Sequence, residues 1–277
     1  MNDIKVIRGG IMISSITSSM MLFVYIIGII IELVDIIKYK NPVYRNVLGL
    51  FRFFSFDGNF LSFIFSIIIC IRNFKVYKIR NDDEKFKDKA VSHFIYIITL
   101  ISACNGIIIL IKSLILLFYP ISVEDWKTNY MGGFKGAAFH FIIPIILTFK
   151  CLVELRKRDL YLYEKFIGGI PISIYVLIMS LLCKSKILTS FDEKDGDGLI
   201  PYPFFDFEHY NFYFCLIMTL FLVVLGFGIS FLLDFLNKKF EKKLCNSPEE
   251  KKQEEEGIND DNRQSFLESA AQPAQPY

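Results

Sequence analysis

The sequence predicts an all-α protein: a polytopic membrane protein built as a six-helix transmembrane bundle, with both termini cytoplasmic and a disordered C-terminal tail. Hydrophobic residues make up 53% of the 277 positions, about 147 side chains, which is more than a water-soluble domain of this size hides. These residues gather in six long runs, and the mean hydropathy is +0.42. The basic residues between the runs lie mainly on one side of the predicted membrane.

Each of the six runs is long enough, or nearly so, to cross a hydrocarbon core of about 30 Å. The first follows Lys5 and Arg8 but is longer than a signal-peptide core, and no small-residue cleavage site follows it, so it is interpreted as a span. The fifth is the shortest, and a tilted neighbour or a locally thinned bilayer accommodates it. The predicted spans are residues 11–34, 47–71, 93–119, 134–154, 167–183 and 211–236.

The lysine and arginine counts of the connecting segments set the orientation. One side carries 17 of them and the other side carries 7. Basic residues accumulate in cytoplasmic loops, so the richer side, which includes both termini, is predicted to be cytoplasmic. The richer side comprises the N-terminus, 72–92, 156–165 and 237–245, and the poorer side comprises 38–47, 119–133 and 184–210.

The composition changes at residue 246, which ends the predicted transmembrane domain of residues 1–245. Residues 246–277 hold eight acidic and three basic side chains, with Phe266 and Tyr277 as the only aromatics. Such a segment cannot bury enough apolar surface to fold, so a disordered acidic tail is predicted.

Composition and motifs also exclude several classes of function. The formal charge of +2 lacks the strong basic excess of a general nucleic-acid binder. The six cysteines are scattered without a CxxC pair, so neither a metal site nor a disulfide framework is indicated, and no cofactor is expected. The chain has no GxxxxGK[ST], GxSxG, HExxH or GxGxxG motif, which leaves ATP-driven, soluble-hydrolase, zinc-protease and dinucleotide chemistry without support.

A polar stripe marks the second predicted span. Ser55, Asn59, Ser62 and Ser66 follow one another at spacings of four, three and four, which places them on one helical face. Small polar residues on one face are typical of a helix–helix interface, and this interpretation suffices for the stripe alone. Thr99, Ser102 and Asn105 give the third span a polar side of its own.

His140 in the fourth span gives the stripe a second interpretation. It lies well inside an apolar segment, where a histidine is a candidate for function, although a hydrogen-bonded structural histidine is the alternative. The second and fourth spans run in the same direction, and Ser55 and His140 lie about eight and six residues from their starts. At about 1.5 Å per residue, both are roughly 10 Å below the same surface. A hydroxyl beside an imidazole is the minimum machinery for nucleophilic acyl transfer.

Other polar residues are placed to support such a site. Arg52, one turn before Ser55, holds a lipid carboxylate or headgroup, or else snorkels to the interface or forms an ion pair. Asp57 lies about 200° around the helix from Ser55 and is expected to pair with a neighbouring span. The segment containing Tyr202 and Asp206 suits an aromatic cap at the same membrane surface. Lys150 lies near a span end, where snorkelling explains it.

Three short motifs carry a resemblance to a known family: FFSFDGN at 53–59, HFIIP at 140–144 and YPFFD at 202–206. In order and spacing they resemble the androgen-induced/androgen-dependent-TFPI-regulating family of six-span membrane proteins and its bacterial relatives, over roughly residues 11–240. The resemblance implies hydrolysis of fatty-acid esters of hydroxy fatty acids by an intramembrane threonine and histidine. Ser55 stands at the threonine position and keeps its hydroxyl, and His140 matches the family histidine.

The leading functional prediction is therefore a multi-pass membrane lipid ester hydrolase, in which Ser55 is the nucleophile and His140 the general base and then acid. Asn59, one turn below Ser55, is a candidate oxyanion donor. The expected partners are the bilayer and a lipid or fatty-acid ester, in the plasma membrane or, in a eukaryote, the endoplasmic reticulum. A proton-coupled or small-solute transporter using Asp57 and His140 is one alternative, and a non-catalytic membrane scaffold is another.

Overall fold

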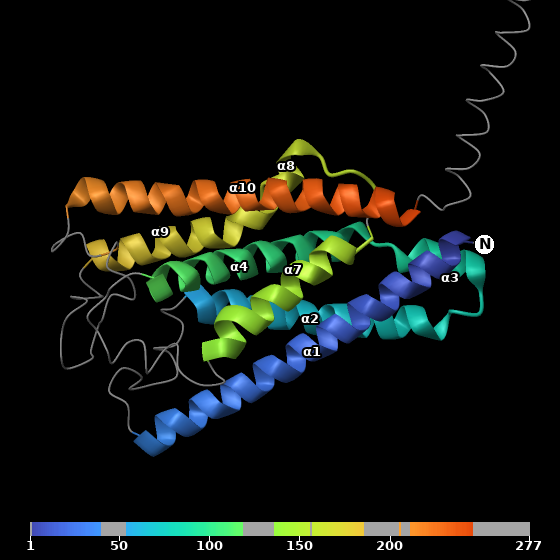
Figure 1. Cartoon of the computed structure of the whole chain (residues 1–277), viewed down its shortest axis with the longest axis horizontal. Coiled ribbons are helices and arrows are strands. Elements are labelled where there is room, and N and C mark those ends of the chain that lie inside the picture. Colours follow the sequence, from blue (N-terminus) through green and yellow to red (C-terminus); the bar gives the residue numbers. More distant parts are fainter. Residues whose placement is uncertain are drawn as a thin grey trace, which may run out of the picture.

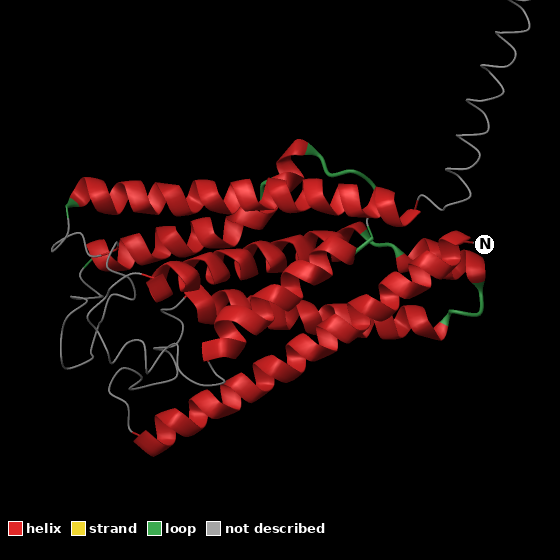
Figure 2. Cartoon of the chain, in the orientation of Figure 1, coloured by secondary structure: helices red, strands yellow, loops and turns green. Residues whose placement is uncertain are grey.

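A computed structural model gives the structure of residues 2–39, 54–118, 136–155, 157–185, 205 and 211–245. Every regular element in these ranges is helical, which confirms the predicted all-α class (Figure 2). The elements are α1 (Asn2–Tyr39), α2 (Phe54–Lys78), α3 (Asp83–Ala90), α4 (His93–Phe118), the π-helical η3 (Ala138–Ile142), α7 (Ile143–Val153), α8 (Leu162–Lys165), the 3-10 turn η4 (Ile167–Gly169), α9 (Ile170–Lys184) and α10 (Phe212–Cys245).

Helices occupy all six places where spans are predicted, and five of them are long and apolar enough to cross a membrane. The expectation that the fifth span is the shortest is wrong. Helical structure begins before it at Leu162, through α8 and η4, and gives 23 residues. Among the described residues the fourth is the shortest instead, because its apolar helix there covers Ala138–Val153. The predicted tail after residue 245 lies outside the described residues.

The helices form an elongated bundle with two distinct ends (Figure 1). One end, called here the α3 end, holds the start of α1, helix α3 and the last turns of α10. Arg8 of α1 donates a hydrogen bond to Asp83 of α3 at 2.9 Å there. The opposite end holds the start of α2 and the end of α4. The predicted basic side of the membrane corresponds to the α3 end.

Helix α4 forms the centre of the bundle, since its residues Leu100, Ala103 and Cys104 are fully buried in the main hydrophobic core. Helix α7 crosses α4 closely. A Cβ placed on Gly106 would lie 3.1 Å from the Cα of Pro144, so glycine permits this approach of the two backbones. Most large apolar side chains that stay exposed lie on α1, α2, α9 and α10, and the exposed apolar helices indicate a membrane-associated protein.

Pro144 also explains the wide turn before α7. Proline has no N–H to give to the carbonyl of residue 140, and its ring clashes with that carbonyl in a regular α-helix. The chain relaxes into a π-turn, closed by the backbone N–H of Ile143 bonding to the carbonyl of Ala138. His140 lies in the middle of this turn, a geometry that recurs at functional sites.

Candidate functional site

His140 has a hydroxyl partner that sequence analysis did not anticipate. Its Nδ1 lies 3.0 Å from Oγ of Ser113, a fully buried serine in the second half of α4. Ser113 donates its single proton to the carbonyl of Ile109 at 2.7 Å, so its oxygen accepts from Nδ1–H of His140. While Ser113 keeps its bond to Ile109, its contact with His140 requires a proton on Nδ1 of the imidazole.

Helical periodicity places Ser113 on the polar side of α4, although it does not identify Ser113 as the partner of His140. Ser113 follows Ser102 by eleven residues, about three turns, and so continues the polar side of α4 toward the opposite end. The described hydroxyl partner of the histidine is thus a serine of α4, while the side chain of Ser55 on α2 lies outside the described atoms.

Asn59 joins α2 to the turn that carries His140. Its Nδ2 donates to the carbonyl of Phe139 at 2.9 Å, and the asparagine is fully buried. This bond makes Asn59 a positioning residue for the π-turn. Ser62 and Ser66 of the same stripe are also buried, which confirms that this face of α2 points into the bundle.

The structure describes one of the next four predicted site residues in part and three of them not at all. The backbone of Ser55 lies in the first turn of α2, one turn before Asn59, while its side chain is outside the described atoms. Arg52, Tyr202 and Asp206 lie outside the described residues.

Asp57 does not share the face of the stripe. It lies on the same side of α2 as Phe60 and Ile64, which are exposed. Its Oδ1 is nevertheless buried and has no hydrogen-bond partner among the described atoms. A pairing of Asp57 with a neighbouring helix, which its position predicted, is therefore not seen in this part of the chain.

Aromatic rings cover the start of α2. Phe54 lies 5.1 Å from Tyr175 of α9, measured between ring centroids, and Tyr175 lies 6.1 Å from Phe205. Phe205 is the described residue of the YPFFD segment and is fully buried. Phe205 thus contacts Tyr175, which in turn packs on Phe54, the residue that precedes Ser55.

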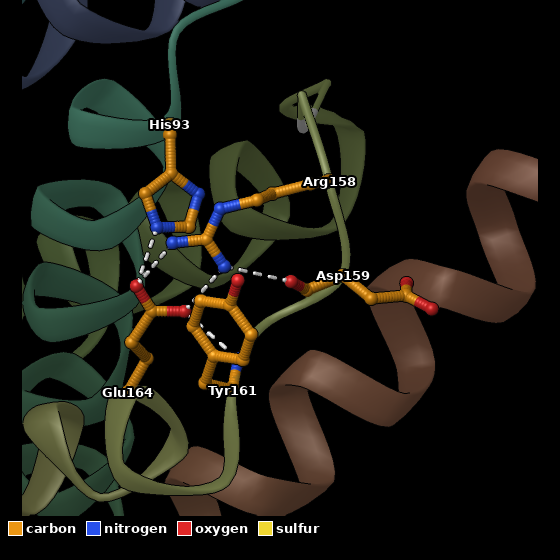
Figure 3. A network of polar contacts seen from close by, with 5 residues as sticks. All are labelled: His93, Arg158, Asp159, Tyr161 and Glu164. Atoms are coloured by element: carbon orange, nitrogen blue, oxygen red, sulfur yellow. Dashed lines mark hydrogen bonds and ion pairs between the residues drawn. The ribbon is translucent and has the colours of Figure 1, made fainter.

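A second polar cluster joins the start of α4 to the connection between α7 and α8 (Figure 3). The Glu164 carboxylate accepts two hydrogen bonds from Arg158, at 2.7 and 2.9 Å, and lies 2.8 Å from Nε2 of His93. The backbone N–H of Tyr161 adds a fourth contact at 2.8 Å. The hydrogen bonds to Glu164 raise the pKa of Arg158. Together the contacts tie the α7–α8 connection to the start of α4. Since the carboxylate is fully occupied, this cluster is a clamp rather than a reactive site.

Lys150 contradicts its predicted role. Only 2% of it is exposed, so it does not snorkel, and its ammonium donates to the hydroxyl of Ser18 on α1. Glu154, one turn further along the chain, is also buried and accepts from Ser14 of α1 at 2.8 Å. The spacing of four on both helices makes a ladder of two rungs between α1 and α7.

Among the described residues, no three His, Cys, Asp or Glu side chains are grouped to hold a metal ion. Fold and site together define the class: a helical bundle of membrane-span-like helices with a buried polar interior. Comparison with protein families, curated proteins and solved structures finds no match to the chain.

Proposed function

We propose that the chain is a multi-pass membrane protein that hydrolyses lipid esters, with Ser55 as nucleophile and His140 as general base and acid. The Asn59–Phe139 hydrogen bond carries the proposal, because it joins the helix of Ser55, one turn away, to the residue before His140. In the proposed reaction, Ser55 attacks the ester carbonyl and His140 takes its proton, then returns it to the departing alcohol. Water, activated by the same imidazole, releases the fatty acid from Ser55.

The register of α2 and α4 supports the pairing. A Cβ placed on Gly58 would lie 3.1 Å from Cδ1 of Ile109, and the two helices run in opposite directions. Ser55 precedes Gly58 by three residues, about 4.5 Å, and Ser113 follows Ile109 by four, about 6 Å. Both displacements are toward the same end of the bundle, so the backbone of Ser55 is at nearly the level of the Ser113–His140 pair.

The tautomer of His140 supports a role as base. A general base needs an acceptor lone pair and a third group that orients it. In the proposed tautomer Ser113 accepts from Nδ1–H and so orients the ring, and Nε2 is the nitrogen that takes the proton of Ser55. In this proposal Ser113 holds the place that a carboxylate has in a serine–histidine–aspartate triad.

The composition of the surroundings supports a lipid substrate. The site lies between helices whose outward side chains are large and apolar, so an acyl chain can approach from the bilayer without crossing water. The proposed topology is the predicted one: six spans, both termini cytoplasmic, and the site in the half of the bilayer away from the cytoplasm.

Activity-based labelling tests the proposal. Purified protein in detergent is treated with a long-chain fluorophosphonate, and hydrolysis of a long-chain nitrophenyl ester is measured in parallel. Ser55→Ala and His140→Ala should both abolish labelling and turnover, while Ser62→Ala, a buried serine of the same face, should keep both. Wild-type labelling in the Ser55 and His140 variants would remove the dyad and favour the scaffold interpretation of the stripe.

A further inference from the structure

Four asparagines are buried among the described residues, and Asn105 of α4 differs from the other three. Nδ2 of Asn59 donates to the turn that carries His140, Nδ2 of Asn73 donates to two serines of α1, and Nδ2 of Asn237 donates to three carbonyls at the end of α7. Neither amide atom of Asn105 has a partner in this part of the chain. The other three asparagines therefore join neighbouring helices, while the carboxamide of Asn105 joins none of the described ones.

Asn105 lies where α4 contacts α2, close to both residues of the proposed dyad. Its Cβ is 3.5 Å from a Cβ placed on Gly58, and Ser55 precedes Gly58 by three residues. Three residues are about 4.5 Å along a helix and about 60° apart around it. The glycine that follows Asn105 lies against Pro144, one turn after His140. The backbones of Ser55 and His140 are thus each about one helical turn from the level of Asn105.

A carboxamide with both polar atoms open complements a hydroxyl group. Nδ2 of Asn105 can donate and its Oδ1 can accept, and an alcohol both accepts and donates through one oxygen. Buried polar atoms are almost always matched by a partner. A neutral group that carries a hydroxyl is therefore the occupant that uses both atoms of Asn105.

The helices leave room beside Asn105 for a small group only. A Cβ placed on Gly58 would lie 3.1 Å from Cδ1 of Ile109, and a Cβ placed on Gly106 would lie 3.1 Å from the Cα of Pro144. An acyl chain does not pass between helices that are packed this closely. The acyl chain of a bound ester must therefore leave toward the lipid, and the short alcohol portion is the part that reaches Asn105.

From these observations we infer that Asn105 selects esters whose alcohol portion carries a free hydroxyl on the carbon next to the ester-linked one. The inference rests on the proposed hydrolysis at Ser55. Four extended bonds separate the carbonyl carbon of such an ester from its hydroxyl oxygen, a span of about 5 Å. This span matches the single turn between Ser55 and Asn105. Asn105 holds the hydroxyl, which places the carbonyl at Ser55, and water then cleaves the ester to a fatty acid and a polyol.

The test compares two oleoyl esters as substrates of the full chain in detergent. The ethylene glycol monoester carries the hydroxyl, and the propyl ester replaces that hydroxyl with a methyl group. Wild-type kcat/KM should be about tenfold or more higher for the glycol ester, because the propyl ester leaves the amide of Asn105 unmatched. Asn105→Leu, which has nearly the shape of asparagine without its polar atoms, should bring the ratio to about one and keep the rate toward the propyl ester.

Thr99→Val is the matched control. Oγ1 of Thr99 is also buried without a partner among the described contacts, but Thr99 lies six residues, about 9 Å, further from Ser55 along α4. Thr99→Val should keep the wild-type ratio. Both variants remove buried polar atoms that bond to no described group, so neither should lower the melting temperature.

Failure of this inference and failure of the proposed hydrolase give different results. Equal kcat/KM for the two esters in the wild type would overturn the role of Asn105 without any variant, and so would an unchanged ratio in folded Asn105→Leu. In both cases hydrolysis at Ser55 would stand. Absence of hydrolysis that depends on Ser55, with either ester, would overturn the hydrolase and this inference together.

Discussion

The side-chain amide of Asn59 donates a hydrogen bond to the backbone carbonyl of Phe139 at 2.9 Å, across 80 residues of sequence. One partner lies one turn after Ser55, and the other immediately precedes His140. Because both ends are buried, the bond fixes the position of the π-turn relative to α2. It is the contact on which the proposed site depends.

Asn59→Leu should destabilise the protein by about 1–2 kcal/mol, because it leaves the carbonyl of Phe139 without its donor. Thermal unfolding in detergent measures the effect. Ser62→Ala is the comparison, since its hydroxyl bonds within α2 to the carbonyl of Gly58 at 2.8 Å and should matter less. Equal losses in the two variants would show that the interhelical bond has no special role.

Ser113→Ala should slow ester turnover by about tenfold to a hundredfold without removing the nucleophile, because the imidazole loses the acceptor that orients it. The label should still attach, only more slowly. Turnover and labelling rates are measured on the same preparation. Complete loss of labelling with the fold intact would instead make Ser113 the attacking residue.

Gly169→Ala should destabilise the contact of η4 with α10. An added Cβ would lie 2.3 Å from Cδ1 of Phe227 and 2.9 Å from its backbone nitrogen. A backbone atom cannot move aside as easily as the end of a flexible side chain. Overpacking of this kind costs about 1–3 kcal/mol. Gly228→Ala, where nothing lies within 4 Å of the added atom, should be neutral or mildly stabilising. Similar melting temperatures for the two variants would contradict the observed packing.

Glu164→Gln should lower the melting temperature more than Asp159→Asn. Glu164 is 8% exposed and binds Arg158 and His93 together, whereas the Asp159–Lys238 pair is largely open to solvent. Exposed ion pairs contribute little, while a buried carboxylate with several donors is hard to replace. The reverse order in a melting experiment would mean that the clamp does not hold the α7–α8 connection.

The start of α3 should loosen in acid. Asp82 caps this helix by accepting from the backbone N–H of Lys85 at 3.1 Å, and its bonds to Lys85 hold the pKa of Asp82 below its usual value. A lowered pKa means that the cap's stabilisation is fully present above the unfolded pKa, about 4, and is lost as pH falls from there through the lower folded pKa. Hydrogen exchange at Lys85 and Phe86 should therefore lose protection in acid more in wild type than in Asp82→Ala. An equal acid response in both would exclude the cap as the cause.

The sequence could predict the helices because long apolar runs and their polar breaks report directly on length and burial. It could also predict the inward face of α2, since Asn59, Ser62 and Ser66 share a period of 3.6 residues. It could not predict that Ser113 rather than another hydroxyl meets Nδ1 of His140. That contact depends on the crossing of α4 and α7 at Gly106 and on the π-turn before Pro144, which no periodicity encodes.

The prediction that Lys150 snorkels to the interface was wrong for a related reason. Position near the end of an apolar run suggests a side chain that reaches the interface, but α1 is long and covers α7 on that side. The lysine is enclosed by its contact with Ser18, and only tertiary packing decides this. Whether a charged residue near a span end snorkels therefore depends on how the neighbouring helix packs against it.

The most direct test of the proposed hydrolase is the identity of the residue that a lipid-like fluorophosphonate modifies. Wild-type protein is labelled in detergent, digested, and analysed by tandem mass spectrometry, with His140→Ala treated in parallel. The proposal predicts an adduct on Ser55 in the wild type and none in the variant. An adduct on Ser113, or on Ser55 to the same extent without His140, would contradict the Ser55–His140 dyad.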